Sequence, residues 1–399
     1  MNKMINLQLF ADPNTNTTTQ TGTGQEMSPQ MKTFYDKVII KNAVPNLVHD
    51  QFGQKKPIPK NSGKTIEFRR LNPFGKTTAP LTEGVTPDGK KLDWATVSAT
   101  VNQYGDYVTT SDILDLTAID NNITEAGRIL GDQAGLSLDG IVREIINAGT
   151  NVQYGEGTKT SRFAIANADV MTVKAIKRAV TTLKRMNAKK INGDYVAIIH
   201  PDVAYDLMND SKWEAVSTYN PKNLYAGEIG RLYGVRFVET SEAKIWKGDD
   251  LASNSRTLTV NGAISSASTT VTFDGGTVAA NALVGRYVLI GDKRVKVTAN
   301  TTSELTVDTA ITAADNAVIY PGEGGAEGIP VYSTLLLGAD AYGTTEIEGG
   351  GLEMIVKPKG SAGTADPLNQ RSTVGWKATK TACILTQAYI VRIETASAY

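Results

Sequence analysis

The sequence predicts an α+β protein that carries a separate all-β module late in the chain. Apolar residues recur at steps of three and four over residues 120–149 and 171–190, the spacing of amphipathic helices. Apolar and polar residues alternate over residues 64–71 and 94–110, as expected of strands. Residues 251–327 are rich in Thr, Val, Ala and Asn, with short alternating stretches between Asn-Gly and Asp-Gly turns, which predicts the inserted β-module.

Length and composition bound the possible functions. A chain of 399 residues exceeds the usual size of one hydrophobic core, so we expect more than one domain. Lys and Arg number 41, and so do Asp and Glu, which argues against a dedicated nucleic-acid binder and suits self-association. The single cysteine, Cys383, excludes an intrachain disulfide and a cysteine-based metal site, and it alternates with apolar residues as a core residue would. The sequence contains no apolar run long enough to span a membrane.

The N-terminal part is expected to form an arm. Residues 14–29 are polar and cannot bury enough apolar surface to offset their ordering entropy, so we expect them to be disordered or extended. The first residues resemble a short signal peptide, but Asn6 and Gln8 interrupt the apolar run and no clean cleavage site follows. Order is expected to begin near residue 31 with a helix that Pro45 ends.

The two strands at residues 64–71 and 94–110 predict a hairpin with an unusually long loop. Turn signals occupy the connection, in "NPFGK" and "TPDGKK". The hairpin has little apolar mass, and two-stranded hairpins are marginal alone in water. We therefore expect it to be stabilised by the rest of its own chain or by another subunit.

The helix predicted over residues 120–149 is the longest in the chain. Its apolar stripe consists of Ile123, Ala126, Leu130, Ala134, Leu138, Ile141 and Ile145. Residues 120–122 offer N-cap side chains and Gly149 a stop. Four glycines, Gly127, Gly131, Gly135 and Gly140, lower its helix propensity and would allow another backbone to approach closely.

The helix predicted within residues 171–190 has a strongly basic outer face. Its inner face comprises Val173, Ile176, Val180, Leu183 and Met186. The outer face carries Lys174, Lys177, Arg178, Lys184, Arg185, Lys189 and Lys190, with no acidic residue among them. Two interpretations stay open: a solvated helix surface, or a face turned toward DNA or an acidic neighbour.

Candidate catalytic and ligand-binding motifs give little support to an enzyme. His200, one of two histidines, follows the apolar run 195–199 and precedes Pro201 and Asp202, which fits a strand-to-helix corner better than a general base. The segment "NSGKT" lacks the upstream glycine and the following helix of a phosphate-binding loop. No residue spacing indicates a metal or cofactor site, so none is expected. A hydrolase that uses His200 and a secreted β-rich adhesin remain as alternatives from other classes.

The order of these elements resembles the major capsid proteins of tailed bacteriophages, which have the Hong Kong 97 type fold. The similarity is carried by "MKTFYDKVIIKNAVPNLVHDQFGQKKPIPKNSGKTIEFRRL", "LTEGVTPDGKKLDWATVSATVNQYGDYVTTSDILDLTAIDNNITEAGRILGDQAG", "GDYVAIIHPDVAYDLMND", "GEIGRLYGVRFVETSEAKIW" and "DPLNQRSTVGWKATKTACILTQAYIVRIE". Together they cover most of the chain outside the arm and the insertion. The start "LQLFAD" is also similar to capsid proteins of phages with Gram-positive hosts.

The resemblance implies a domain layout and a structural function. It implies an N-terminal arm (1–52), an extended loop over a neighbouring subunit (53–110), a peripheral domain with a spine helix (111–159), an axial domain (160–250 and 328–350), the inserted all-β domain (251–327) and a return to the peripheral domain (351–399). Hexamers and pentamers would form an icosahedral shell around packaged double-stranded DNA in the virion, assembled in the host bacterial cytoplasm. No enzymatic activity and no membrane partner are implied.

Two departures from the minimal family pattern set further expectations. The arm is short and polar, so we expect a separate scaffolding protein, together with a portal. The inserted module would serve as a surface decoration, would clamp neighbouring capsomers, or would meet decoration proteins. For the contact between subunits we expect the hairpin residues Phe68, Trp94, Val97 and Val101, and for DNA or an acidic partner Lys174, Lys177, Arg178, Lys184 and Arg185.

Overall fold

The chain divides into two compact units. The computed structural model describes residues 15–16, 48–71, 74–117, 122–211, 213, 230–361 and 366–399. The first unit comprises residues 1–50, 54–142 and 342–385, and the second comprises 51–53, 143–341 and 386–399. The expected helix from residue 31 lies outside the described residues, as does most of the expected arm.

A six-stranded sheet forms the centre of the first unit, counted over the described residues. Its order is β1 (Thr15–Asn16), β5 (Asn102–Ser111), β20 (Arg371–Ile384), β18 (Tyr342–Thr345) and β2 (Gln54–Lys55), with β19 (Glu353–Lys357) paired to β20. Strands β5 and β20 run antiparallel from Ser111 opposite Arg371 to Asn102 opposite Lys380. The short helix α2 (Asp112–Thr117) follows β5 directly.

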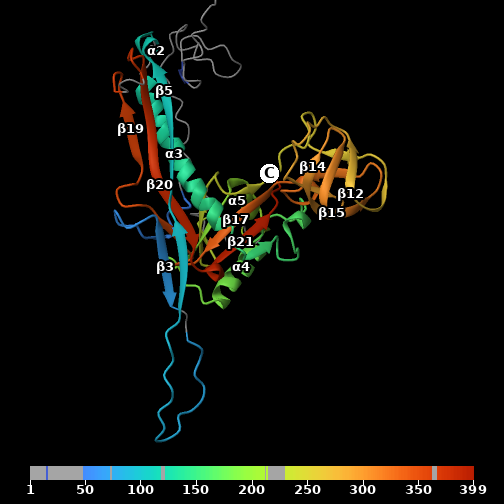
Figure 1. The fold of residues 1–399 in the computed structure, drawn as a ribbon. Helices are drawn as coiled ribbons and strands as arrows, with labels where there is room; N and C mark the ends of the chain where they lie inside the picture. The colour runs from blue at the N-terminus through green and yellow to red at the C-terminus, as the bar shows by residue number, and fades with distance from the viewer. Residues whose placement is uncertain are drawn as a thin grey trace, which may run out of the picture. The chain divides into compact units, whose positions relative to one another are not determined.

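Helix α3 (Asn122–Asn147) lies along this sheet and confirms the predicted spine helix (Figure 1). Leu130 and Ala134 pack on Val374, Trp376 and Ala378 of β20. Farther along, the buried positions are Val142 and Ile146, rather than the predicted Ile141 and Ile145, which are only partly buried. Successive steps of four carry the buried stripe around the helix, because one turn takes only 3.6 residues.

The glycines of α3 do not bring a second backbone close in the described structure. A Cβ added at Gly127 would meet only the side chains of Met354 and Val374, at 3.8 and 3.9 Å. At Gly131 and Gly140 no described atom lies within 4 Å of that position. The expectation of a close backbone contact is therefore wrong at these three positions.

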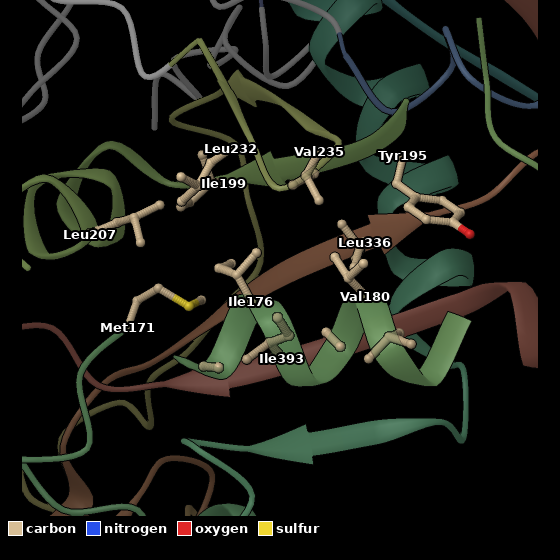
Figure 2. Close-up of a cluster of buried hydrophobic side chains, with 14 of the residues drawn as sticks. Met171, Ile176, Val180, Tyr195, Ile199, Leu207, Leu232, Val235, Leu336 and Ile393 are labelled. Atoms are coloured by element: carbon tan, nitrogen blue, oxygen red, sulfur yellow. The ribbon is translucent and has the colours of Figure 1, made fainter. Parts of the chain in front are cut away.

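The second unit is built on a seven-stranded mixed sheet. Within the described residues its order is β6 (Val152–Tyr154), β21 (Ile390–Thr395), β17 (Val331–Leu337), β7 (Tyr195–Ile199), β9 (Val235–Glu239) and β8 (Arg231–Leu232), with β10 (Ile245–Trp246) paired to β17. Helices α4 (Val173–Arg185) and α5 (Pro201–Met208) belong to the same unit. Figure 2 shows the core between α4 and the sheet, where Ile176 and Val180 of α4 face Leu336 and Ile393 of the sheet.

The predicted β-module is a closed six-stranded barrel. Its strands are β11 (Leu258–Val260), β12 (Ile264–Asp274), β13 (Tyr287–Ile290), β14 (Lys293–Asn300), β15 (Glu304–Ala313) and β16 (Val318–Pro321). They close in the order β11-β12-β15-β14-β13-β16, and β16 pairs back to β11. Val271, Leu305 and Ile319 lie in a core of the barrel's own, so the module buries its own apolar surface (Figure 1).

The strand region predicted over residues 94–110 is divided in the structure, and so is the C-terminal strand segment. Residues 94–110 split at Val101 into β4 (Trp94–Thr100), which pairs only with β3 (Thr65–Leu71), and β5, which joins the large sheet. The C-terminal stretch splits at a short 3-10 turn, Gln387–Tyr389, so that β20 belongs to the first unit and β21 to the second. The last strand therefore does not return to the sheet of the spine helix.

Candidate interaction surfaces

The base of the extended hairpin packs on its own chain. Strands β3 and β4 pair from Thr65 opposite Thr100 to Leu71 opposite Trp94. Phe68 is only 5% exposed and clusters with Ala99 and Cys383. Gly343 makes room for the ring, because an added Cβ would lie 2.8 Å from it. Burial raises the pKa of the Cys383 thiol to about 11, which fits the expected core role.

The loop that joins the two strands presents apolar side chains to solvent. Residues 74–93 form neither helix nor strand. The exposed large apolar residues here are Phe74, Leu81, Val85, Leu92 and Trp94, from 53% exposed at Phe74 to 75% at Leu81. Of the four residues expected to meet a neighbour, Trp94 is exposed, Val97 is half-buried against the Phe68 cluster, and Phe68 and Val101 are buried.

The basic face of α4 is partly engaged by its own chain. Glu156, in the loop after β6, accepts a bond from Lys174 Nζ at 2.6 Å. Arg178 donates to the carbonyl oxygens of Glu156 and Gly157, both at 3.1 Å. Lys177 Nζ lies 4.2 Å from the ring centre of Tyr233.

The other end of the helix leaves its cations exposed. Lys184 and Arg185 lie in the last turn and are exposed, and the described residues offer them no ion pair. Met186, expected on the inner face, is 49% exposed because the helix ends at Arg185. Three of the five predicted basic residues thus contact their own chain, and two face solvent.

His200 forms the predicted strand-to-helix corner. It follows β7 and caps α5: its Nδ1 accepts the backbone N–H of Asp202 at 3.2 Å, and Pro201 takes the first helical position. Burial lowers the pKa of His200, although the carboxylates of Asp202 and Glu242 oppose that shift. Tyr332 donates to Asp202 Oδ2 at 2.8 Å. Capping of α5 by the Nδ1 atom thus explains why His200 stands at this corner.

The second unit contains a buried ion cluster that the sequence did not predict. Glu394 is fully buried and accepts bonds from Arg162 Nε at 2.7 Å and Arg392 Nε at 2.8 Å. Arg162 also lies 3.7 Å from the ring centre of Trp246. Arg392 donates in addition to the carbonyl oxygen of Gly149, just past α3, at 2.9 Å. The cluster links segments of the unit that are distant in sequence. The spacing of its residues in the sequence does not predict it.

The described residues hold no arrangement typical of a metal centre or a membrane anchor. No group of three or more His, Cys, Asp or Glu side chains is placed to hold a metal ion. Over the same residues, none of the helices has both the length and the apolar character required to cross a bilayer. The "NSGKT" segment is a turn, with positive φ at Asn61 and Gly63, that leads into strand β3.

Comparisons with known proteins identify the fold and a similarity to one family over part of the chain. Residues 94–250 match a family model described as phage capsid protein. The capsid of cyanophage P-SCSP1u aligns with a TM-score of 0.55 at 13% identity, over 95% of this chain and 96% of that one. The cyanophage Pam1 capsid gives 0.55 and 13%, over 95% and 100%. The capsid of Ralstonia phage GP4 gives 0.54 and 13%, over 88% of each chain.

Residues 94–250 are thus similar to a phage capsid family, and the chain has the fold of phage capsid proteins. It has the predicted Hong Kong 97 type fold, with the β-barrel inserted. A search of curated protein sequences finds no match. The secreted adhesin has no support in the family match or in the fold.

The surfaces of this protein could be predicted only in part. The sequence pointed to the long loop, because its turn residues separate two strands by more than 20 positions. It did not indicate which hairpin residues the same chain would cover, since that depends on β18 and β20. Glu156, which pairs with the basic helix, lies in "YGEGTKT", where no local pattern predicts a contact with that helix.

Proposed function

We propose that the capsid protein forms hexamers and pentamers of an icosahedral shell that encloses double-stranded phage DNA. Assembly would occur in the cytoplasm of the host bacterium, with a separate scaffolding protein and a portal. In this proposal the first unit supplies the extended loop and the peripheral domain, and the second supplies the axial domain. The family match over residues 94–250 and the capsid fold support the proposal, but the surfaces must be argued from the chain itself.

The loop at residues 74–94 is the surface on which the proposal mainly depends. Phe74, Leu81, Val85 and Leu92 are exposed on a segment without helix or strand, and Trp94, the first residue of β4, is exposed beside them. Exposed apolar groups gathered in this way mark interaction sites. Each fully buried side chain of this type contributes about 1.5–3 kcal/mol. We therefore assign the docking role to Phe74, Leu81, Val85, Leu92 and Trp94, and assign Phe68 and Val101 to the stability of the monomer.

Docking of this loop on a neighbour is a heterologous contact, in which one face meets a different face. Such contacts close into rings when the rotation between copies allows it. Six or five repeats of one modest contact then stabilise the ring together, since each further contact is intramolecular. A weak loop can in this way support a stable shell.

The experiment changes the loop without changing the fold. Leu81→Ser combined with Val85→Ser should abolish shells seen by electron microscopy and leave soluble protein whose melting temperature is unchanged. Val284→Ser is the matched control, because Val284 is 46% exposed on the barrel. Normal particles from the double variant would contradict the docking role, as would an equal defect in the control.

For the exposed end of α4 we propose contact with the packaged DNA. Lys184 and Arg185 are free of ion pairs among the described residues, whereas Lys174 and Arg178 are already engaged. Reversing both to Glu should lower the DNA content of particles while their yield stays normal. A fall in particle yield instead would favour an acidic neighbouring subunit, and no change in either would exclude both roles. Lys293→Glu on the barrel is the charge-matched control, since Lys293 is exposed.

Two alternative roles for the barrel are open in this proposal, and one deletion distinguishes them. If it clamps neighbouring capsomers, a chain that lacks residues 257–320 should make capsomers but few shells. If it decorates the surface or receives decoration proteins, that chain should still make shells. The barrel has its own core, so its removal takes away a module that buries its own apolar residues.

A further inference from the structure

Strand β19 forms a free edge of the sheet in the first unit. Residues Glu353–Lys357 pair with Lys377–Thr373 of β20 on one side. On the other side no described strand pairs with it, and Figure 1 shows it at the margin of the sheet beside β20. Unpaired backbone groups along an edge readily accept another strand, so an open edge is a site for pairing between chains.

The surroundings of this edge are apolar and exposed. Leu352, Met354 and Val356 are 51%, 42% and 55% exposed. Met354 and Val356 lie opposite Trp376 and Val374, whose side chains face α3, so they share that face of the sheet. Ile129 of α3 is also exposed, at 57%. An edge flanked by such residues is expected to be covered in the assembled protein.

The sequence of β19 is complementary to itself. It reads Glu-Met-Ile-Val-Lys from Glu353 to Lys357. When two copies run antiparallel around a two-fold axis at Ile355, each Glu353 lies opposite Lys357 of the other copy and each Met354 opposite Val356. Opposite charges and apolar pairs facing each other across strands are stabilising. Glu353 would then lie between this lysine and Lys377 of its own chain, which is 3.8 Å away.

Other ways of pairing two copies of β19 are less favourable. Parallel pairing in register places Glu353 beside Glu353 and Lys357 beside Lys357, and like charges facing each other are destabilising. After a shift of one residue, Met354 and Val356 of one copy lie on the opposite face of the joined sheet from Met354 and Val356 of the other copy. The terminal charges therefore specify one orientation and one register.

We propose that β19 pairs with β19 of a second copy across a two-fold axis, which joins their two sheets into one. The contact is isologous, in contrast to the heterologous docking of the loop, and it gives rings a second kind of contact through which they would meet other rings. It extends the proposed function by naming one surface at which capsomers would meet. Met354 and Val356 of each copy become covered at the new seam.

Single cysteines test the two-fold register. Only Ile355 faces itself, with Cα atoms about 4.5–5.5 Å apart, within the span of a disulfide. Two copies of residue 356 would lie about 8 Å apart, beyond that span. The native Cys383 is buried, so background linkage is low. Under mild oxidation, assembled Ile355→Cys protein should become mainly disulfide-linked dimer, whereas Val356→Cys should remain monomer on a non-reducing gel.

A charge exchange in the Ile355→Cys background tests the same contact independently. Lys357→Glu places two carboxylates opposite each other at both ends of the seam and should lower the linked fraction roughly fourfold or more. Adding Glu353→Lys restores opposite charges and should restore linkage. The loss should shrink in 1 M salt, where the Debye length is about 3 Å. Lys293→Glu, on the barrel, should have no effect.

Each outcome tests either the β19 contact or the proposed shell-forming function. Particles without Ile355 linkage, or with equal linkage at residue 356, overturn the contact and leave the proposed function standing. Linked dimers without particles support the contact and count against the shell. Some amide protons of β19 point away from β20. If these resist hydrogen exchange in the unassembled chain, its own chain covers the edge, which also overturns the inference.

Discussion

Replacing Phe68 by Ala should unfold the first unit more readily, because this ring is the centre of the hairpin's attachment. The side chain is 5% exposed and packs on Ala99 and Cys383. Gly343, opposite the ring, leaves no side chain of its own to fill the space. Truncating a buried Phe to Ala costs about 3–5 kcal/mol. For a unit of this size each kcal/mol lowers the melting temperature by about 2–4 °C, so we expect a fall of roughly 6–20 °C.

Calorimetry of the unassembled chain, purified by size exclusion, measures this fall without the stabilising effect of a shell. Trp94→Ala is the matched control, since Trp94 ends the same hairpin but is 54% exposed. It should leave the melting temperature within about 1 °C and instead reduce particle yield. The reasoning fails if Phe68→Ala melts like the natural protein, or if Trp94→Ala melts as early as Phe68→Ala.

Three further predictions concern the second unit. Glu394→Gln should cost about 3–5 kcal/mol of stability, seen as earlier melting, because it leaves the buried guanidinium of Arg392 and the half-buried one of Arg162 without their carboxylate. Burial lowers the pKa of His200, so the folded protein favours the neutral imidazole. The stability that neutral His200 contributes is therefore complete above the unfolded pKa of about 6.5 and is lost as the pH falls below that value. His200→Asn keeps a capping acceptor, and its melting temperature should therefore fall less between about pH 7.5 and 5 than that of the natural protein; an equal fall would refute the capping role. Gly157→Ala should destabilise slightly more than Gly193→Ala: both glycines have positive φ, but only at Gly157 would the Cβ displace a side chain, the flexible end of Arg178 with its bonds to the carbonyl oxygens of Glu156 and Gly157.

Elements defined by local signals could be predicted from the sequence. The strand-to-helix corner at His200 was predicted because Pro201 suits a first helical turn and the preceding run suits a buried strand. Helices α3 and α4 followed from apolar spacing, and the barrel from its turns and alternation. These signals act within a few residues, so one sequence contains them.

Breaks in long strand regions could not be predicted, because they depend on partners distant in sequence. Val101 separates β4 from β5, and nothing local there resembles a turn. The break exists because Asn102–Ser111 finds Lys380–Arg371 as a partner, while Trp94–Thr100 finds Leu71–Thr65. The same limit applies to the docking surface: Phe68 and Trp94 are equally apolar in the sequence, and only β18 and β20 determine which one is covered.

Residues 321–328 are closely packed, although their glycine-rich sequence is typical of a linker. A Cβ at Gly325 would lie 2.6 Å from the carbonyl oxygen of Ile165, and one at Gly324 would lie 2.2 Å from that of Ile329. The stretch also accepts a bond from Arg294, at 2.6 Å on the carbonyl oxygen of Gly322. Glycine permits both free rotation and close backbone approach, so its presence alone cannot distinguish a hinge from a tight contact. Here the contacts favour the second, and the segment that follows the barrel is held by its own backbone packing.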